Sequence, residues 1–177
     1  MKLGAEGISS FSDGTTESDV AATLYAIIRD GVLGTHPWSF ATAYAELTSL
    51  PSAPLSNFEH AFELPADFIK AISAGDDCRS RGAVYQIIGR EVHTNYEELT
   101  LTYIKRADEA EFPTYFISAL VNRLAAEFCL PLTENSSRSE TLYRLAEAEL
   151  KLAKLIDSQQ DTPPRVEDFS LIRARLT

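Results

Sequence analysis

Four carboxylates in one stretch of the chain are the residues best suited by type to acid–base chemistry. They are Glu46, Glu59, Glu63 and Asp67, in a region whose prolines and alternating apolar residues indicate that it folds back on itself. Two carboxylates that face each other across a cleft can hydrolyse a glycosidic bond, one of them as the acid. An acidic chain always supplies some such pair, so residue type alone does not define an active site here.

The sequence contains none of the common motifs of catalysis, metal binding or nucleotide binding. It has no glycine-rich dinucleotide fingerprint and no P-loop, and His36, His60 and His93 belong to no HExxH or cysteine–histidine pattern. Asp76 and Asp77 follow a glycine, but no calcium-loop spacing follows them. We therefore expect no catalytic residue, no metal and no cofactor, and a protein that is not an enzyme.

The individual histidines and cysteines are predicted to be structural. His93 alternates with polar residues on an expected strand, which favours an exposed position, whereas His60 shares a strand face with phenylalanines, as is typical of a core or interface. Cys129 lies among large apolar residues and is predicted to be a small core residue. Cys78 lies in a polar stretch, and we expect no disulfide between the two.

The charge of the chain argues against tight binding to nucleic acid. The net charge is −10, and all of it lies in residues 1–137, which hold nine basic and nineteen acidic residues. Residues 138–177 hold seven of each. The pairs Arg79 with Arg81 and Lys105 with Arg106 are too few to form a basic stripe. The acidic surface either aids solubility or keeps a passing nucleic acid from sticking.

The pattern of apolar residues predicts helices at both ends of the chain and strands between them. A polar arm, 1–15, precedes a helix that Thr16 or Ser18 can cap and that ends by Gly34. The following segments are predicted as strands: 38–50, 57–64, 83–88, 91–94 and 99–104, with a helix as the competing interpretation of 38–50 and an antiparallel meander over 83–104. Helices are predicted over 67–73, from Phe112 to about Pro131, and over 139–158.

These elements predict an α+β protein that is mainly helical. We expect an antiparallel helix bundle or hairpin with an antiparallel β insertion of four or five strands, and extended terminal arms. The boundaries are an arm over 1–15, a domain over 16–158 and a tail over 159–177. Within the domain, the β insertion covers about 38–106 and the helical hairpin 112–158. No apolar run of the length that crosses a membrane is evident.

The tail carries the most suggestive short motif. Phe169, Leu171, Ile172 and Leu176 are interleaved with Arg173 and Arg175, and they follow a Pro163–Pro164 break. The tail is therefore interpreted either as a docking peptide that enters a groove on a partner, as a segment that packs back on its own domain, or as a disordered end.

Six blocks of sequence, in this order, resemble a known family. They are Pro37-Trp38-Ser39-Phe40-Ala41, Phe62-Glu63-Leu64-Pro65-Ala66-Asp67-Phe68, Tyr85-Gln86-Ile87-Ile88-Gly89-Arg90, Leu101-Thr102-Tyr103-Ile104, Phe112-Pro113-Thr114-Tyr115-Phe116 and Arg123-Leu124-Ala125-Ala126. Together they resemble the tail tubular proteins, or head-to-tail adaptors, of short-tailed bacteriophages. The blocks fall within residues 20–157, and the resemblance rests on their order and spacing.

The resemblance implies a structural protein of the virion tail, made in the host cytoplasm. Members of the family form a dodecameric ring between the portal protein and the tail nozzle protein, and the genomic DNA leaves through the ring without specific binding. The family's C-terminal segment reaches into the portal assembly. By position, the portal-docking residues here would be Phe169, Leu171, Ile172, Arg173 and Arg175. The family supplies no catalytic residue, cofactor, metal or membrane contact.

Three other interpretations remain open. The chain could be a connector beneath the portal of a long-tailed phage or gene-transfer particle, since those are also small and ring-forming. It could be a tail-associated cell-wall hydrolase, which would need converging acids in a cleft. It could also be an unassigned α+β domain with none of these functions.

Overall fold

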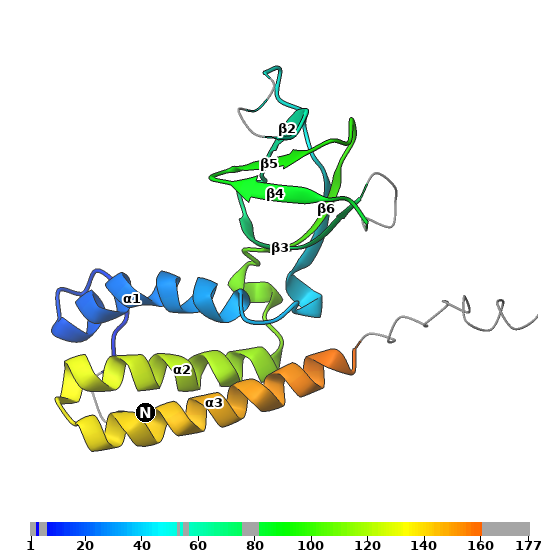
Figure 1. Ribbon diagram of the computed structural model, residues 1–177. Helices are drawn as coiled ribbons and strands as arrows, with labels where there is room; N and C mark the ends of the chain where they lie inside the picture. The colour runs from blue at the N-terminus through cyan, green and yellow to red at the C-terminus, as the bar shows by residue number, and fades with distance from the viewer. Residues whose placement is uncertain (1–2, 4–6, 53, 55–56, 76–81, 161–177) are drawn as a thin grey trace, which may run out of the picture.

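A computed structural model describes residue 3 and residues 7–52, 54, 57–75 and 82–160. Three helices form one layer, the helical layer, and the strands form a separate β unit at the end of the layer where the first helix ends (Figure 1). The helices are α1 (Thr16–Leu33), α2 (Thr114–Thr133) and α3 (Ser136–Ser158), with 3₁₀ turns η1 (Ser39–Ala41) and η2 (Glu109–Glu111). The strands are β1 (Thr42–Glu46), β2 (His60–Glu63), β3 (Phe68–Gly75), β4 (Tyr85–Ile88), β5 (Glu91–Thr94) and β6 (Thr100–Lys105).

Side chains cap the N-termini of α1 and α3. Thr15, one residue before the predicted caps, accepts a hydrogen bond from the backbone N–H of Ser18, and the Ser18 hydroxyl accepts one from the N–H of Thr15. Between α2 and α3, Glu134 adopts a left-handed conformation with φ 52°, and Asn135 caps α3. This short turn reverses the chain, so α3 runs back along α2.

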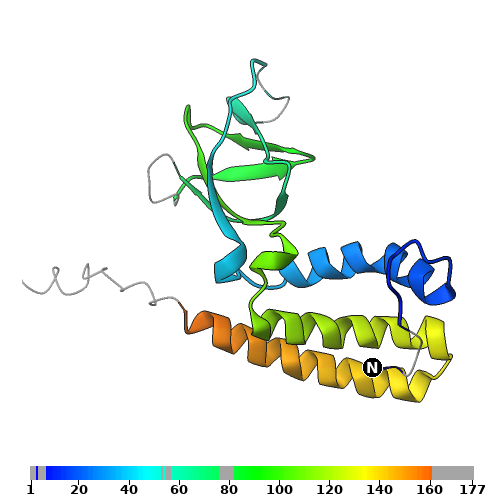
Figure 2. The same ribbon diagram turned by 180° about the vertical axis from the view of Figure 1, so that it is seen from behind.

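Helix α2 is the middle element of the helical layer. It contacts α1 on one side and α3 on the other, as the views from the front and from behind agree (Figure 2). Tyr115, in the first turn of α2, bonds to Asp157 near the end of α3, and Tyr143 bonds to Glu127, so the two helices are antiparallel.

By length and composition, α2 is also the helix of the described residues that could cross a membrane. Length and composition alone are weak evidence for a membrane span, because the core helix of a soluble protein also has them. Phe116, Ala126 and Cys129 of α2 are fully buried in the protein, as predicted for Cys129. The place of α2 between two other helices therefore explains part of its apolar composition, while Ile117, Val121 and Leu130 are 44%, 44% and 53% exposed.

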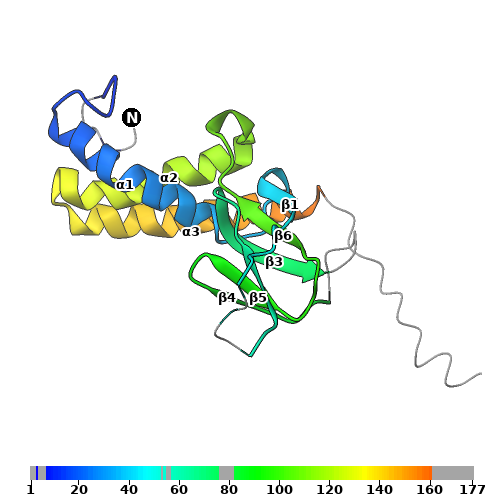
Figure 3. The same ribbon diagram turned by 90° about the horizontal axis from the view of Figure 1, so that it is seen from above.

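The β unit consists of two small antiparallel sheets (Figure 3). One sheet has the order β1-β6-β3 and the other the order β2-β5-β4. The predicted hairpin of β4 and β5 is confirmed, with Gly89 at φ 62° in its tight turn. The predicted meander is wrong beyond that hairpin, because β6 pairs with β1 and β3 instead of β5.

Strand β3 is the clearest error of the sequence-based prediction, which expected a helix over 67–73. The strand carries two register irregularities against β6, between Phe68 and Lys70 and between Ala71 and Ser73. Because of these irregularities Phe68, Ala71 and Ala74, which are three residues apart, all lie in the core of the β unit, whereas Ile69 packs against the helices. The apolar residues consequently do not alternate, and the pattern looks helical.

The fold class predicted from the sequence, a mainly helical protein built on a helix bundle, is wrong. The described residues form an α+β fold with three α helices and six strands in two small antiparallel sheets. The reason is physical: the strands bury a hydrophobic core of their own. Phe62, Val92 and Leu101 are its most buried members.

A second core joins the helical layer to the β unit. Trp38 and Ala41 before β1, Ile104 of β6 and Phe116 of α2 are all fully buried in it. The Trp38 and Phe116 rings meet edge to face with centroids 5.1 Å apart, and Phe40 lies 4.9 Å from Phe116. Residues from two of the resemblance blocks therefore pack together at the junction.

Candidate functional site

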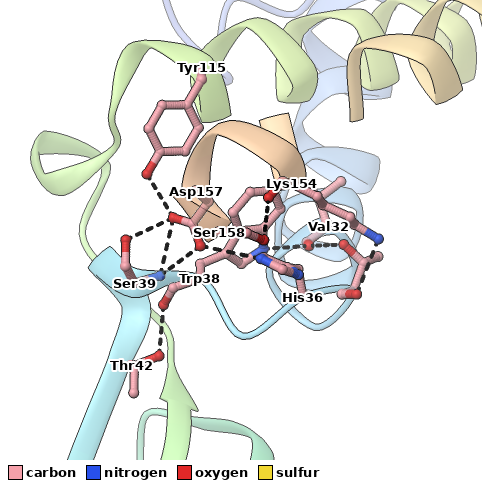
Figure 4. A network of polar contacts seen from close by, with 10 residues as sticks. Val32, His36, Trp38, Ser39, Thr42, Tyr115, Lys154, Asp157 and Ser158 are labelled. Carbon is pink, nitrogen blue, oxygen red and sulfur yellow. Dashed lines mark hydrogen bonds and ion pairs between the residues drawn. The ribbon is translucent and has the colours of Figure 1, made fainter. Parts of the chain in front are cut away.

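The most concentrated polar arrangement in the described residues surrounds Asp157, in the last turn of α3 (Figure 4). Its side chain is only 3% exposed. The carboxylate accepts hydrogen bonds from the backbone N–H of Ser39 at 3.1 and 3.2 Å, from the Ser39 hydroxyl at 2.8 Å and from the Tyr115 hydroxyl at 2.7 Å. His36 Nε2 lies 3.3 Å from Oδ2. We call Asp157, Ser39, Tyr115 and His36 the Asp157 network.

The elements around the network hold each of its members in place. Ser39 begins η1, and the preceding Trp38 is fixed because its indole N–H donates to the carbonyl of Val32 at 3.1 Å. Lys154, one turn before Asp157, donates to the carbonyl of Thr35 at 3.2 Å. The end of α3 is thus fastened to the segment between α1 and β1, and the C-terminal segment leaves from a fixed point.

Electrostatics in the network favour a neutral histidine and a protonated tyrosine. Burial lowers the pKa of His36 below its usual 6.5, and nearby Lys154 also lowers it, while Asp157 acts in the opposite direction. Burial and then the hydrogen bond to Asp157 raise the pKa of Tyr115 above its usual 10. At neutral pH both His36 and Tyr115 are therefore neutral.

The network contains a serine, a histidine and an aspartate, but it lacks the geometry of a catalytic triad. In a triad the serine hydroxyl bonds to the histidine, which becomes the base. Here the Ser39 hydroxyl donates to the Asp157 carboxylate. The arrangement satisfies a buried charge and ties three segments together, which is a structural role.

A second feature of α3 is an apolar stripe on the side of the helix away from its core face. Ala146 and Ala153 are buried against the protein, whereas Leu145, Leu152 and Leu155 are 45%, 50% and 58% exposed. With the exposed Ala148, the three leucines recur at the three- and four-residue spacing of a heptad seam. We call Leu145, Ala148, Leu152 and Leu155 the α3 stripe; it marks a face that can bind another apolar segment.

The carboxylates singled out from the sequence are dispersed. Glu46 and Glu63 line the same open hollow of about 280 Å³, but both are exposed and lack the buried surroundings of a general acid. Asp67 instead accepts a hydrogen bond from the Tyr103 hydroxyl at 3.0 Å. Burial, and then this hydrogen bond, raise the pKa of Tyr103 to about 12. Glu59 precedes β2 and does not line the hollow.

His93, Lys105 and Arg106 also have partners within the described residues. His93 is buried, so the prediction that it is exposed is wrong, and its Nε2 lies 3.0 Å from Glu91. Lys105 and Arg106 form ion pairs with Glu111 and Asp30, each at 2.9 Å. No group of three or more histidine, cysteine or acidic residues that could hold a metal occurs in the described ranges.

Several predicted residues fall outside the described part of the chain. They include the portal-docking set Phe169, Leu171, Ile172, Arg173 and Arg175, as well as Asp76, Asp77, Cys78, Arg79 and Arg81. The Asp157 network was missed by the sequence analysis. Its signal is one acid in register with the buried Ala146 and Ala153 and the partly buried Leu150 of α3, where an apolar residue is expected.

No protein-family model matches the chain, and no curated protein matches its sequence.

Proposed function

We propose that this protein is a structural component of a bacteriophage tail, without enzymatic activity, which joins the portal to the tail nozzle as one subunit of a ring. The ring, dodecameric by the family resemblance, lines the channel for the leaving DNA. The single observation that carries this proposal is the contact between two blocks of the resemblance. Trp38 and Phe40 of one block pack on Phe112 and Phe116 of another at the junction of the helical layer and the β unit.

The surface of α3 suits a subunit that packs against other chains. The helix is apolar on two sides: Ala146 and Ala153 face the core, and the α3 stripe faces outward. A helix that serves only its own domain needs one apolar face. The stripe offers a neighbouring subunit in the ring a face on which to pack.

The position of the C-terminal segment supports a role in docking. The Asp157 network fastens the end of α3, so Gln160 and the residues that follow start from a defined place. The apolar residues Phe169, Leu171 and Ile172, with Arg173 and Arg175 among them, would then reach into a groove of the portal.

The charge of the chain suits a channel wall. Each copy carries a net charge of −10, and a ring of copies would repel the phosphates of duplex DNA. DNA could then slide past the wall without binding to it. The portion from 138 to 177, with equal numbers of acidic and basic residues, carries none of this net charge and can lie between subunits.

The proposal is tested by measuring binding of the full chain to the portal ring encoded in the same genome, using co-elution in size-exclusion chromatography. The expected result is a stable complex that is lost when Phe169→Ser and Ile172→Ser are combined. Thr162→Ser, in the same tail but outside the apolar motif, is the matched control and should bind normally. A wild-type chain that never co-elutes with the portal would contradict the proposal.

A further inference from the structure

We propose that, in the free protein, the C-terminal segment 161–177 lies back along α3 and covers the α3 stripe of its own chain. The contact itself is inferred from the stripe and the sequence of the segment. Its consequence, that the segment must leave the stripe before it docks elsewhere, rests on the function proposed above.

The stripe is an apolar surface that needs a partner. Leu145, Leu152 and Leu155 leave about half of each side chain exposed in the described residues, and Ala148 lies between them. Burial of apolar surface is favourable by about 25 cal/mol for each Å² removed from water. Three half-exposed leucines on one line therefore favour an apolar occupant.

The length of the segment and its starting point allow it to be that occupant. The segment begins directly after Gln160, and Pro163 and Pro164 cannot continue α3 as a helix. At 1.5 Å per residue, Leu145 lies about 22 Å back along the helix from Gln160. Residues 161–168 span at most about 26 Å when extended, so Phe169 can reach any leucine of the stripe.

The apolar residues of the segment match the stripe in extent. From Phe169 to Leu176 an extended chain covers about 23 Å, and the stripe from Leu145 to Leu155 covers about 15 Å. Phe169, Leu171, Ile172 and Leu176 therefore suffice to cover the three leucines.

Charge and attachment favour this segment over a second copy of the chain. A second copy brings one chain with a net charge of −10 toward another with the same charge. Residues 138–177, which include α3 from its third residue onward and the segment, hold seven basic and seven acidic residues. The segment is also tethered at the end of the same helix, which gives an effective concentration on the order of millimolar. In dilute solution the segment, which is tethered and carries no net charge, therefore binds the α3 stripe before a second copy of the chain does.

Such a contact would couple portal docking to subunit packing. While the segment covers the stripe, neither the stripe nor Phe169, Leu171 and Ile172 is available to a partner. When the portal takes the segment, the stripe becomes free for the neighbouring subunit. Ring formation would thereby be confined to chains that are already on the portal.

The test is photo-crosslinking in the full-length chain, with p-benzoylphenylalanine in place of Leu155. Leu155 is 58% exposed, so the replacement leaves the core intact. The expected product has the mass of one chain and joins position 155 to the peptide that contains Phe169 and Ile172. The product should be lost when Phe169→Ser and Ile172→Ser are introduced together, and circular dichroism should show the same helix content in both chains.

The matched control carries the same reactive residue in place of Glu147, which is exposed on another side of α3. This control should give no adduct with the C-terminal segment. Products from position 155 with the mass of two chains, or no adduct with the segment at all, would overturn the inference. Portal binding is measured separately, so a chain that crosslinks as expected but ignores the portal refutes the proposed function and leaves the inference standing.

Discussion

The carboxylate of Asp157 accepts hydrogen bonds from both the backbone N–H and the hydroxyl of Ser39, a residue 118 positions earlier in the chain. Ser39 opens the segment that leads into β1, and Asp157 lies in the last turn of α3. One buried side chain therefore connects the entrance of the β unit with the end of the helical layer. The segment proposed to dock on the portal, 161–177, starts four residues after Asp157.

Replacing Asp157 with asparagine should destabilise the protein by about 2–4 kcal/mol. The amide keeps the volume but has one acceptor oxygen instead of two, and its NH₂ group would face the donors of Ser39 and Tyr115. Urea unfolding followed by circular dichroism measures the change. Glu147→Gln, at an exposed position of the same helix, is the control and should change stability by less than about 0.5 kcal/mol. Equal stability of the two variants would show that the network has no structural role.

Phe116→Ala should cost about 3–5 kcal/mol of stability, because Phe116 is fully buried where the helical layer meets the β unit. The cavity would remove ring contacts with Trp38, Phe40 and Phe112. The neighbouring Ile117→Ala provides the control, since Ile117 is 44% exposed and should cost less than about 1 kcal/mol. Thermal or urea unfolding of both variants separates the two outcomes, and a small effect at position 116 would contradict the assignment of this core.

His36 should make the protein less stable in mild acid. Its pKa in the folded state lies below 6.5, the usual value that it regains on unfolding, so between these two values the unfolded chain binds more protons. The stability contribution of His36 is complete above pH 6.5 and is lost as the pH falls toward the folded-state pKa. His36→Gln keeps a donor toward Asp157 but does not titrate.

The measurement is the shift of the urea midpoint from about pH 7.5 to about pH 5.5 in the two chains. The wild type should lose more stability than His36→Gln over this interval. If the variant loses as much as the wild type, His36 is not the group responsible.

The protein should not bind duplex DNA. With a net charge of −10, and with Lys105 and Arg106 engaged in ion pairs, it offers phosphates little attraction. Fluorescence anisotropy with a labelled duplex should give a Kd weaker than about 10⁻⁴ M at physiological salt, the weak end of nonspecific binding. Tight binding that weakens steeply with added salt would reveal a basic surface and contradict the proposed channel wall.

The strands with regular alternation could be predicted from the sequence, and the irregular one could not. The alternation of Phe62 and Leu64 with Glu63 led to a predicted strand that contains β2, and Gly89 marked the turn of the β4–β5 hairpin. In β3 the register irregularities place Phe68, Ala71 and Ala74, at a spacing of three, in one core, so the pattern loses its period of two. Sequence periodicity also could not predict that β6 and β5 belong to different sheets, because the pairing of strands is set by tertiary packing.

In helix α3 the sequence likewise could not show which apolar residues are buried. Leu145, Ala146, Leu152 and Ala153 are all apolar residues of the predicted helix 139–158, but the structure buries the alanines and exposes the leucines. A helical wheel places these residues around the helix but cannot say which side meets α2. Asp157 lay at a buried position of the same wheel, and only the contacts with Ser39 and Tyr115 explain why a charge is tolerated there.

The most direct test of the central claim is the mass of the full-length chain in solution, determined alone and after mixing with the portal ring. The account predicts a monomer alone and, on the portal, a complex whose added mass corresponds to a closed ring of copies. A chain that remains monomeric in the presence of the portal would contradict the account and favour an α+β domain with another function.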